Sequence, residues 1–384
     1  MSLNLSRRNL LKSSGLALGA GLLSPRAIFP VEAPVIPDAK AEPMVRLSLN
    51  ENPYGPSPRV AEAIRREFDR LNRYADAKAA RQLAEQIAAH ERVSVEQVVL
   101  GEILGLLGSY LASEGGPGSE FLYSTPGYLA LIDAAVRAGG VGVPVPLDTT
   151  FRNDLTALSA KISARTRAVY LVNPHNPTGT VNENERFKQF LWESSQHAVA
   201  IVDEAYLEYT DDFSQRSAVS LVREGANVIV FRTFDKIHGL AGLPIGFVLA
   251  PRGLANALLK LGAGDAEALG RLNIAAAAAA LSDTAQVAQT RAIVARERAK
   301  WLTVLRDANL KHTESRTNSV FFDAGQPQPK LAAALRSQGI EIGRPHPPYT
   351  NWARITIGTP DENLRAQTAL LQALPRAAAE FTAS

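Results

Sequence analysis

The chain has 384 residues, of which 46% are hydrophobic and 21% are charged, and its formal net charge at pH 7 is +3. This composition is typical of a globular protein, and the length suits a large domain with a smaller one. The absence of cysteine excludes disulfides and thiolate metal sites, and no two of the six histidines have the spacing of a metal site on one helix.

The first 41 residues have the pattern of an export signal. Arg7 and Arg8 precede an apolar stretch at 13–24 that is too short to span a membrane, which takes about 20 apolar residues. The pattern resembles a twin-arginine signal with a small-residue cleavage motif at 39–41, and the alternative is a flexible basic tail. Residues 1–41 hold five of the 41 Lys/Arg and two of the 38 Asp/Glu. The rest of the chain is therefore balanced in charge. We expect an exported, periplasmic protein with no nucleic-acid partner and no stable membrane insertion.

After this segment, helical and strand patterns alternate along the chain. Residues 59–71 and 79–90 have apolar positions at helical spacing. Short apolar runs follow, and they suit strands buried on both faces of a mostly parallel sheet. The runs are at 120–123, 142–147, 168–172, 198–202, 227–231 and 245–250.

A helical region at about 269–308 leads to a second group of elements. Apolar runs at 319–324 and 353–358 flank a helical pattern at 329–338, which predicts a small α+β domain. We predict an α/β fold with helices on both faces of the sheet. The predicted segments are a signal at 1–41, an N-terminal arm at 42–60, a large domain that holds the site at 61–285, and a small C-terminal domain at 286–384.

Polar side chains follow consecutive strands of the predicted sheet. Asn176 comes after the third run, Asp203 and Tyr206 after the fourth, and Lys236 after the fifth. Ligands of open parallel sheets bind beyond the carboxyl ends of the strands, so these side chains should converge on one crevice. Each one alone has an ordinary explanation, as a turn, a helix cap or a solvated lysine. Together, in this order, they predict a site.

Catalysis with pyridoxal 5'-phosphate needs such a set of residues. Lys236 can form a Schiff base with the cofactor aldehyde, and Asp203 can keep the ring nitrogen protonated. Asn176 and Tyr206 can supply donors near the ring hydroxyl. Tyr128 follows the first run and can supply an aromatic face for the ring.

The motifs as a set resemble the class I/II aminotransferases of fold type I, and most closely the histidinol-phosphate aminotransferase branch. The similarity covers nearly all of residues 45–370. The motifs occur in the order of that branch: LNENPYG at 49–55, NRYAD around Tyr74, NPHNPTG at 173–179, VDEAY at 202–206, RTFDKIHGLAGL at 232–243 and WARITIGTP at 352–360.

The resemblance implies further roles. Arg354 matches the arginine that binds the substrate α-carboxylate, for which a guanidinium is suited, and the alternative is a surface arginine on an edge strand. Tyr74 matches a residue that reaches the cofactor phosphate of the partner subunit, which implies a homodimer. Asn52 and Tyr54 match residues at the substrate entrance, and Thr233 remains at the phosphate subsite.

The chain departs from the family at this phosphate subsite. The family usually has a serine before the lysine and an arginine eight residues after it, where this chain has Asp235 and Pro244. The small-residue turn whose free N–H groups cradle the anion is shortened to Gly101 and Glu102. Either the phosphate is held differently, or the protein no longer binds the cofactor in the usual way. The intact ring-binding set favours the first explanation.

These motifs predict an aminotransferase that moves an amino group between an L-amino acid and a 2-keto acid. Arg344 and aromatic residues near Arg354 favour an aromatic or bulky substrate. One alternative is histidinol-phosphate aminotransferase itself, against which export argues. The others are another pyridoxal-phosphate reaction, such as a lyase or racemase step, and a non-catalytic ligand-binding relative with an eroded phosphate site.

Overall fold

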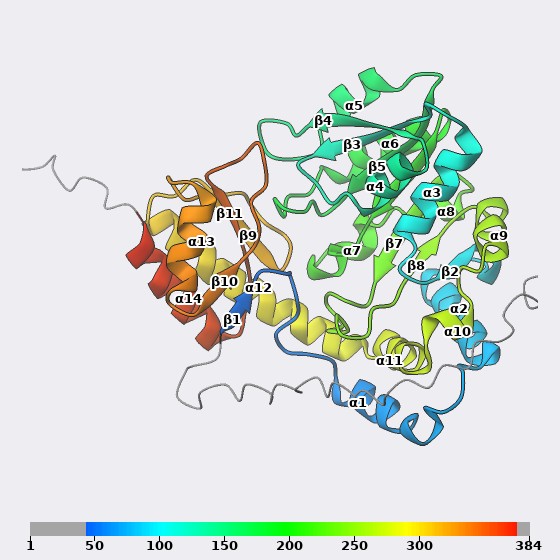
Figure 1. Cartoon of the computed structure of the whole chain (residues 1–384), viewed down its shortest axis with the longest axis horizontal. Coiled ribbons are helices and arrows are strands. Elements are labelled where there is room, and N and C mark those ends of the chain that lie inside the picture. Colours follow the sequence, from blue (N-terminus) through cyan, green and yellow to red (C-terminus); the bar gives the residue numbers. More distant parts are fainter. Residues whose placement is uncertain (1–43, 375–384) are drawn as a thin grey trace, which may run out of the picture. The chain divides into compact units, whose positions relative to one another are not determined.

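The computed structural model describes residues 44–374, in which seven strands form one sheet (Figure 1). The strand order is β2-β8-β7-β6-β5-β3-β4, and only β8 runs antiparallel to its neighbours. The predicted mostly parallel sheet is confirmed. Its strands are β2 (Val98–Leu100), β3 (Glu120–Thr125), β4 (Val141–Pro146), β5 (Thr166–Val172), β6 (Val199–Asp203), β7 (Val228–Thr233) and β8 (Gly246–Leu249).

Both faces of this sheet are covered, which explains why its central strands consist mainly of apolar runs, with polar residues toward their ends. In β6, Ala200 and Val202 belong to one buried cluster, whereas Val199 and Ile201 belong to another on the opposite face. The helices of this part are α1 (Pro58–Arg65), α2 (Ala77–Glu91), α3 (Leu104–Gly115), α4 (Ala130–Arg137), α5 (Leu155–Lys161), α6 (Asn184–Ser195), α7 (Phe213–Arg216), α8 (Val219–Arg223), α9 (Arg252–Lys260), α10 (Ala266–Leu269), α11 (Arg271–Ser282) and the short η2 (Phe68–Arg70), η3 (Val95–Gln97) and η4 (Leu207–Tyr209).

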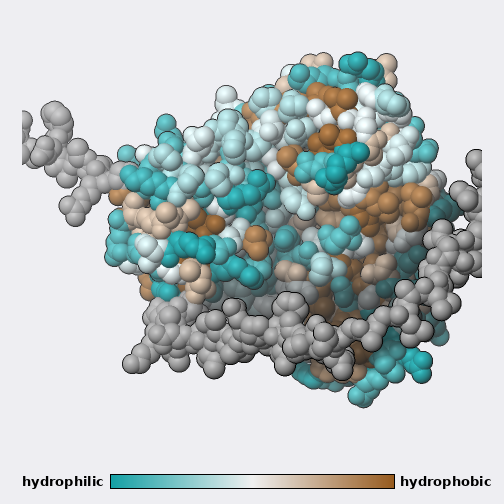
Figure 2. Space-filling model, in the orientation of Figure 1, coloured by the Kyte–Doolittle hydropathy of each residue, from teal (hydrophilic) through white to brown (hydrophobic). Residues whose placement is uncertain are grey.

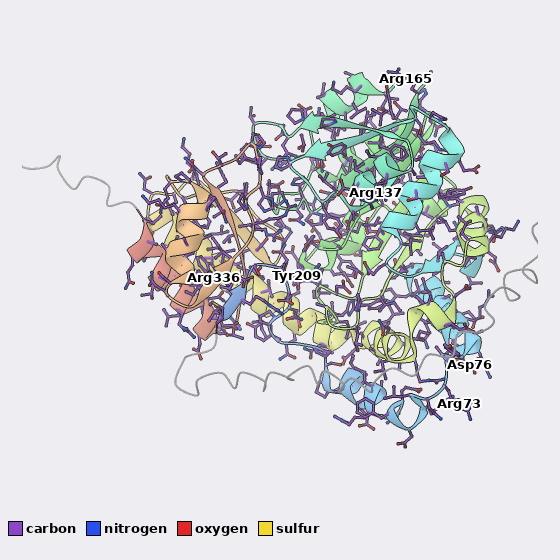
Figure 3. All side chains as sticks on the ribbon, in the orientation of Figure 1. Arg73, Asp76, Arg137, Arg165, Tyr209 and Arg336 are labelled. Atoms are coloured by element: carbon purple, nitrogen blue, oxygen red, sulfur yellow. The ribbon has the colours of Figure 1, made fainter. Side chains whose placement is uncertain are left out.

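A third buried cluster joins the two ends of the described chain. Trp301 is fully buried in it, and Tyr209 of η4, labelled in Figure 3, packs there too. Two small sheets contribute to this cluster, since β1 pairs in parallel with β10 and β9 pairs antiparallel with β11. The elements are β1 (Val45–Leu47), α12 (Thr284–Asp307), β9 (Ser319–Asp323), α13 (Gln328–Arg336), β10 (Ile340–Ile342), β11 (Trp352–Thr356) and α14 (Pro360–Ala373).

Two elements differ from the sequence prediction. The helical region at 269–308 is interrupted at Asp283, which has a non-helical backbone and whose side chain accepts a bond from Gln286 N as the cap of α12. Strand β4 lies at the edge of the sheet and half of its residues are exposed, a position that tolerates Pro144 and Pro146.

Two other predictions concern segments and boundaries. The predicted export signal at 1–41 lies outside the described residues, and the predicted domain boundaries at 60 and 285 stay predictions. Within residues 44–374, every helix is too short or too polar to cross a membrane.

Candidate active site

One cavity lies beyond the carboxyl ends of β5, β6 and β7, the place where open parallel sheets bind ligands. Six of the residues predicted from the sequence line it, so the polar strand ends converge as expected. Its lining consists of Glu102, Leu104, Tyr128, Val172, Asn176, Asp203, Ala205, Tyr206, Phe231, Thr233, Asp235 and Lys236.

Asp203 is a buried carboxylate at the end of β6. It accepts hydrogen bonds from the Tyr170 hydroxyl and from Ala205 N, each at 3.0 Å. Burial raises the pKa of Asp203 to about 6, although these bonds and the charge of Lys236 act to lower it. A cation bound in the cavity would therefore stabilise this anion. The sequence reasoning missed Tyr170, because it lies inside an apolar run and only the pairing of β5 with β6 brings it to Asp203.

Lys236 stands in the loop that follows β7, and the N-terminal arm holds this loop in place. Asn52 Nδ2 donates to Ile237 O at 2.9 Å. A Cβ on Gly239 would lie 2.5 Å from the backbone of Gly55, so only glycine permits this approach. Lys236 is half-buried, and within the described part of the chain no hydrogen bond or ion pair engages its amine. The amine is thus free to react.

Arg354 reaches the same region from β11. Its Nη1 donates to Asn176 Oδ1 at 2.6 Å and its Nη2 donates to Ser48 O at 2.7 Å. The side chain is only 8% exposed, so the alternative of a surface arginine is wrong. Burial lowers the pKa of Arg354, and its Nε–H is buried without a partner among residues 44–374. This unused donor beside a cavity residue suits the binding of a carboxylate.

Comparison with known proteins decides the family. Residues 42–370 match the family Aminotransferase class I and II. The chain belongs to the class I and II aminotransferases. It is 34% identical over 328 residues to an aromatic amino acid aminotransferase of Thermobifida fusca (85% of this chain, 89% of that one). It is also 34% identical over 340 residues to histidinol-phosphate aminotransferase 2 of Pseudomonas fluorescens (87% and 90%).

A solved structure agrees with this assignment. The histidinol-phosphate aminotransferase of Sinorhizobium meliloti, crystallised with pyridoxal 5'-phosphate, matches this aminotransferase with a TM-score of 0.79 and 30% identity, over 86% of this chain and 91% of that one. The resemblance seen in the sequence is confirmed.

Class I and II aminotransferases depend on pyridoxal phosphate, and one end of this cavity suits the ring of that cofactor. Asp203 offers a buried negative charge for a protonated ring nitrogen. Tyr128 is 45% exposed, which leaves its aromatic face open to a stacked ring. Asn176 and Tyr206 line the same cavity and carry amide and phenol donors. The ring end of the cavity therefore fits the cofactor.

The other end of the cavity does not suit a phosphate dianion. The Thr233 hydroxyl donates to Glu102 Oε1 at 3.1 Å, and Asp235 lies beside this pair. The Glu102 residue is exposed as a whole, but desolvation of its carboxyl raises its pKa to about 7, and the negative charge of Asp235 adds to the rise. Lys236 is the only basic side chain among the described lining residues. The shortened turn drew attention to Glu102 in the sequence, but the contact of Glu102 with Thr233 could not be predicted from that turn.

Four predicted residues, Arg354 among them, do not line the cavity of the described chain. Asn52 holds the Lys236 loop instead, and Tyr54 packs against the cluster around Trp301. Tyr74 is 78% exposed, on a segment whose neighbours Arg73 and Asp76 are labelled in Figure 3. The roles of these residues toward substrate and phosphate stay predictions.

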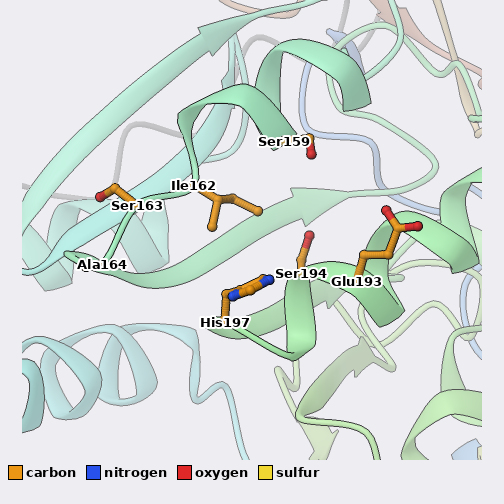
Figure 4. Close-up of a pocket in the computed structure, with 7 residues that line it drawn as sticks. All are labelled: Ser159, Ile162, Ser163, Ala164, Glu193, Ser194 and His197. Atoms are coloured by element: carbon orange, nitrogen blue, oxygen red, sulfur yellow. The ribbon is translucent and has the colours of Figure 1, made fainter.

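A second pocket lies at the end of the sheet opposite to this cavity, and Figure 4 shows the residues that line it. Its residues come from α5, from α6 and from the loops that precede β5 and β6, so it is at the amino ends of these strands. It shares no residue with the cavity around Lys236 and has no lysine or arginine in its lining, which consists of Ser159, Ile162, Ser163, Ala164, Glu193, Ser194 and His197. We therefore place the active site at the carboxyl ends.

Proposed function

We propose that the protein moves an amino group between an L-amino acid and a 2-keto acid, with a pyridoxal cofactor in the cavity around Lys236. The observation that carries this proposal is the meeting of a free lysine amine and a buried carboxylate in one cavity, with Arg354 bonded to Asn176 at its edge. When bound, the cofactor supplies a carbonyl that condenses with amines and a ring that takes up an electron pair.

The residues of the chain divide the remaining tasks. Asp203 holds a proton on the ring nitrogen, because its buried charge is stabilised by a cation. Lys236 would act as the base that takes the proton from the substrate α-carbon and then as the acid that gives it back. Arg354 binds the substrate carboxylate through Nε and keeps the α-carbon near Lys236. Tyr206, whose hydroxyl accepts from Asn50 Nδ2 at 3.2 Å, donates toward the ring hydroxyl together with Asn176.

An aromatic or bulky amino acid is the substrate class that we propose. Trp352 stands two residues before Arg354 on β11, so both side chains leave the same face of the strand. The Trp352 ring lies 4.5 Å from that of Phe151 and 5.0 Å from that of Phe321. These rings give an apolar surface on the side of the carboxylate-binding arginine. The Thermobifida fusca relative is named for aromatic amino acids, which supports this choice.

We also propose a homodimer in which Tyr74 completes the site of the neighbouring subunit. Three large apolar side chains, Phe68, Leu71 and Tyr74, are exposed on the segment between α1 and α2. Figure 2 shows that hydrophobic patches interrupt the hydrophilic surface on the face in view. Exposed apolar clusters of this kind are typical of protein interfaces.

We also propose that the segment at 1–41 directs export of the protein to the periplasm.

A half-reaction tests the proposed function. The purified protein is incubated with pyridoxal or its 5'-phosphate and scanned for the visible absorbance of an imine. An aromatic amino acid is then added, and the keto acid released is measured against the protein. We expect stoichiometric keto acid from the wild type and none from Lys236→Ala, whereas Lys260→Ala on the exposed surface of α9 should behave as wild type.

Three results would contradict the proposal. Full activity of Lys236→Ala would remove the mechanism. An imine without keto acid would favour another reaction on the same fold, such as a lyase or racemase step. The absence of an imine with both pyridoxal and its 5'-phosphate would favour a ligand-binding relative without catalysis.

A further inference from the structure

The end of the cavity beyond the ring presents hydrogen-bond acceptors. The Thr233 hydroxyl donates its hydrogen bond to Glu102 Oε1, and Thr233 Oγ1 accepts a hydrogen bond from Asp235 N at 3.1 Å. Asp235 Oδ1 is buried and has no partner among residues 44–374. This oxygen requires a donor, because a buried acceptor without one costs free energy.

A phosphate dianion cannot satisfy this end of the cavity, because it also offers only acceptors. The Glu102 residue is exposed as a whole, but its Oε1 lies against Gly246, where a Cβ would approach it to 2.8 Å. The Glu102 carboxylate accepts the hydrogen bond of the Thr233 hydroxyl, and Asp235 adds a second negative charge nearby. Pro244, whose carbonyl accepts from Asn273, contributes no side-chain charge.

A hydroxymethyl group would match the same end. Its O–H can donate to Asp235 Oδ1, and it carries no charge to be repelled by Glu102. Helix α3 begins at Leu104 and its N-cap residue, Ile103, forms no side-chain cap, so this helix end favours an anion nearby. The Glu102 carboxylate is an anion that the chain itself supplies at this point.

We propose that Glu102 and Asp235 fill the phosphate subsite with the protein's own carboxylates, so that this cavity binds the dephosphorylated vitamers, pyridoxal and pyridoxamine, in preference to their 5'-phosphates. The inference rests on the proposed function, since it assumes that the ring end takes a pyridoxal ring. In this proposal Asp235 accepts a hydrogen bond from the 5'-hydroxymethyl group, and this member of the family binds the form of the cofactor that carries no phosphate.

Titration calorimetry of two amines tests this assignment most directly. Pyridoxamine and pyridoxamine 5'-phosphate differ only in the phosphate, form no imine with Lys236, and avoid the ring closure of free pyridoxal. We expect the cofactor-free protein at pH 8 to bind pyridoxamine at least tenfold more tightly than pyridoxamine 5'-phosphate. At that pH the Glu102 carboxyl, whose pKa is about 7, is mostly ionised.

Variants identify the groups responsible. The double substitution Glu102→Gln with Asp235→Asn keeps the shapes and removes both charges, so the preference for pyridoxamine should fall at least tenfold. Glu114→Gln, at an exposed position near the other end of α3, should keep it. The reverse design, Asp235→Ser with Pro244→Arg, should raise the affinity for pyridoxamine 5'-phosphate by about tenfold to a hundredfold, as charge-assisted hydrogen bonds do.

The outcomes separate this inference from the proposed function. Tighter binding of pyridoxamine 5'-phosphate by the wild type would overturn the inference and leave the aminotransferase proposal intact. An unchanged preference in the well-folded Glu102→Gln/Asp235→Asn variant would also overturn it, because the carboxylates would then not select the vitamer. Failure of both amines to bind would overturn both proposals.

A second readout is mass spectrometry after borohydride reduction, which should find a pyridoxyl group on Lys236 after incubation with pyridoxal.

Discussion

Replacing Asp203 by asparagine should stabilise the cofactor-free protein at pH 8 while it removes activity. Burial raises the pKa of this carboxyl from 3.8 to about 6 in the folded state. At about 1.4 kcal/mol per pKa unit, ionised Asp203 lowers the free energy of unfolding by about 3 kcal/mol above pH 6. Asparagine removes this cost but has one acceptor oxygen for the two donors, Ala205 N and Tyr170 OH. Losing one hydrogen bond costs about 1 kcal/mol, which leaves a net gain of about 2 kcal/mol.

The pH dependence gives this prediction its sign. Because the folded pKa of Asp203 lies above its unfolded value, the native state binds the additional proton between pH 6 and pH 3.8. The wild type therefore gains stability as the pH falls through this window. The advantage of Asp203→Asn, about 2 kcal/mol at pH 8, should shrink to about zero at pH 4.5.

Urea titrations followed by tryptophan fluorescence at the two pH values measure this difference. Comparing variant with wild type at each pH cancels the other titrating groups. Asp76→Asn, at an exposed helix N-cap where asparagine caps equally well, should leave the difference near zero at both pH values. An Asp203→Asn variant that is no more stable than wild type at pH 8 would refute the argument from burial. The same variant should lose about 10²-fold or more in transamination, as electrostatic terms at such sites commonly do.

Three further predictions concern substrate, assembly and location. Arg354→Lys should raise the KM for the amino acid about tenfold to a hundredfold with unchanged vitamer binding, since the charge-assisted hydrogen bond from Nε is lost; an unchanged KM would contradict its carboxylate role. Light scattering should find a dimer, and Tyr74→Ala should weaken binding of the 5'-phosphate form of the cofactor, whose phosphate Tyr74 is expected to reach; a fully active monomer would exclude the shared site. A reporter fused to residues 1–41 should be exported, and changing Arg7 and Arg8 to lysine should stop this; continued export would disprove the signal.

The sequence allowed the main sheet and the ring-binding residues to be predicted because both depend on local patterns. An apolar run followed by a polar residue marks a buried strand and its ligand-facing end, which located Asp203 and Lys236. The pairing of β1 with β10 and the bond from Arg354 to Asn176 join residues far apart in the chain, so no local pattern indicates them. The contact of Glu102 with Thr233 likewise depends on how β2 and β7 flank β8.

The pairing of β1 with β10 also constrains how the protein is made. Val45 stands beside Ile340, and the arm that follows β1 holds the Lys236 loop through Asn52. During synthesis on the ribosome, β1 has no strand partner until residues 340–342 have emerged, almost 300 residues later. Such long-range closure is slow, because chain entropy is lost before the contact forms. We expect that a nascent chain ending before β10 has an unanchored catalytic loop, so the active site assembles only after the residues of β10 have been made.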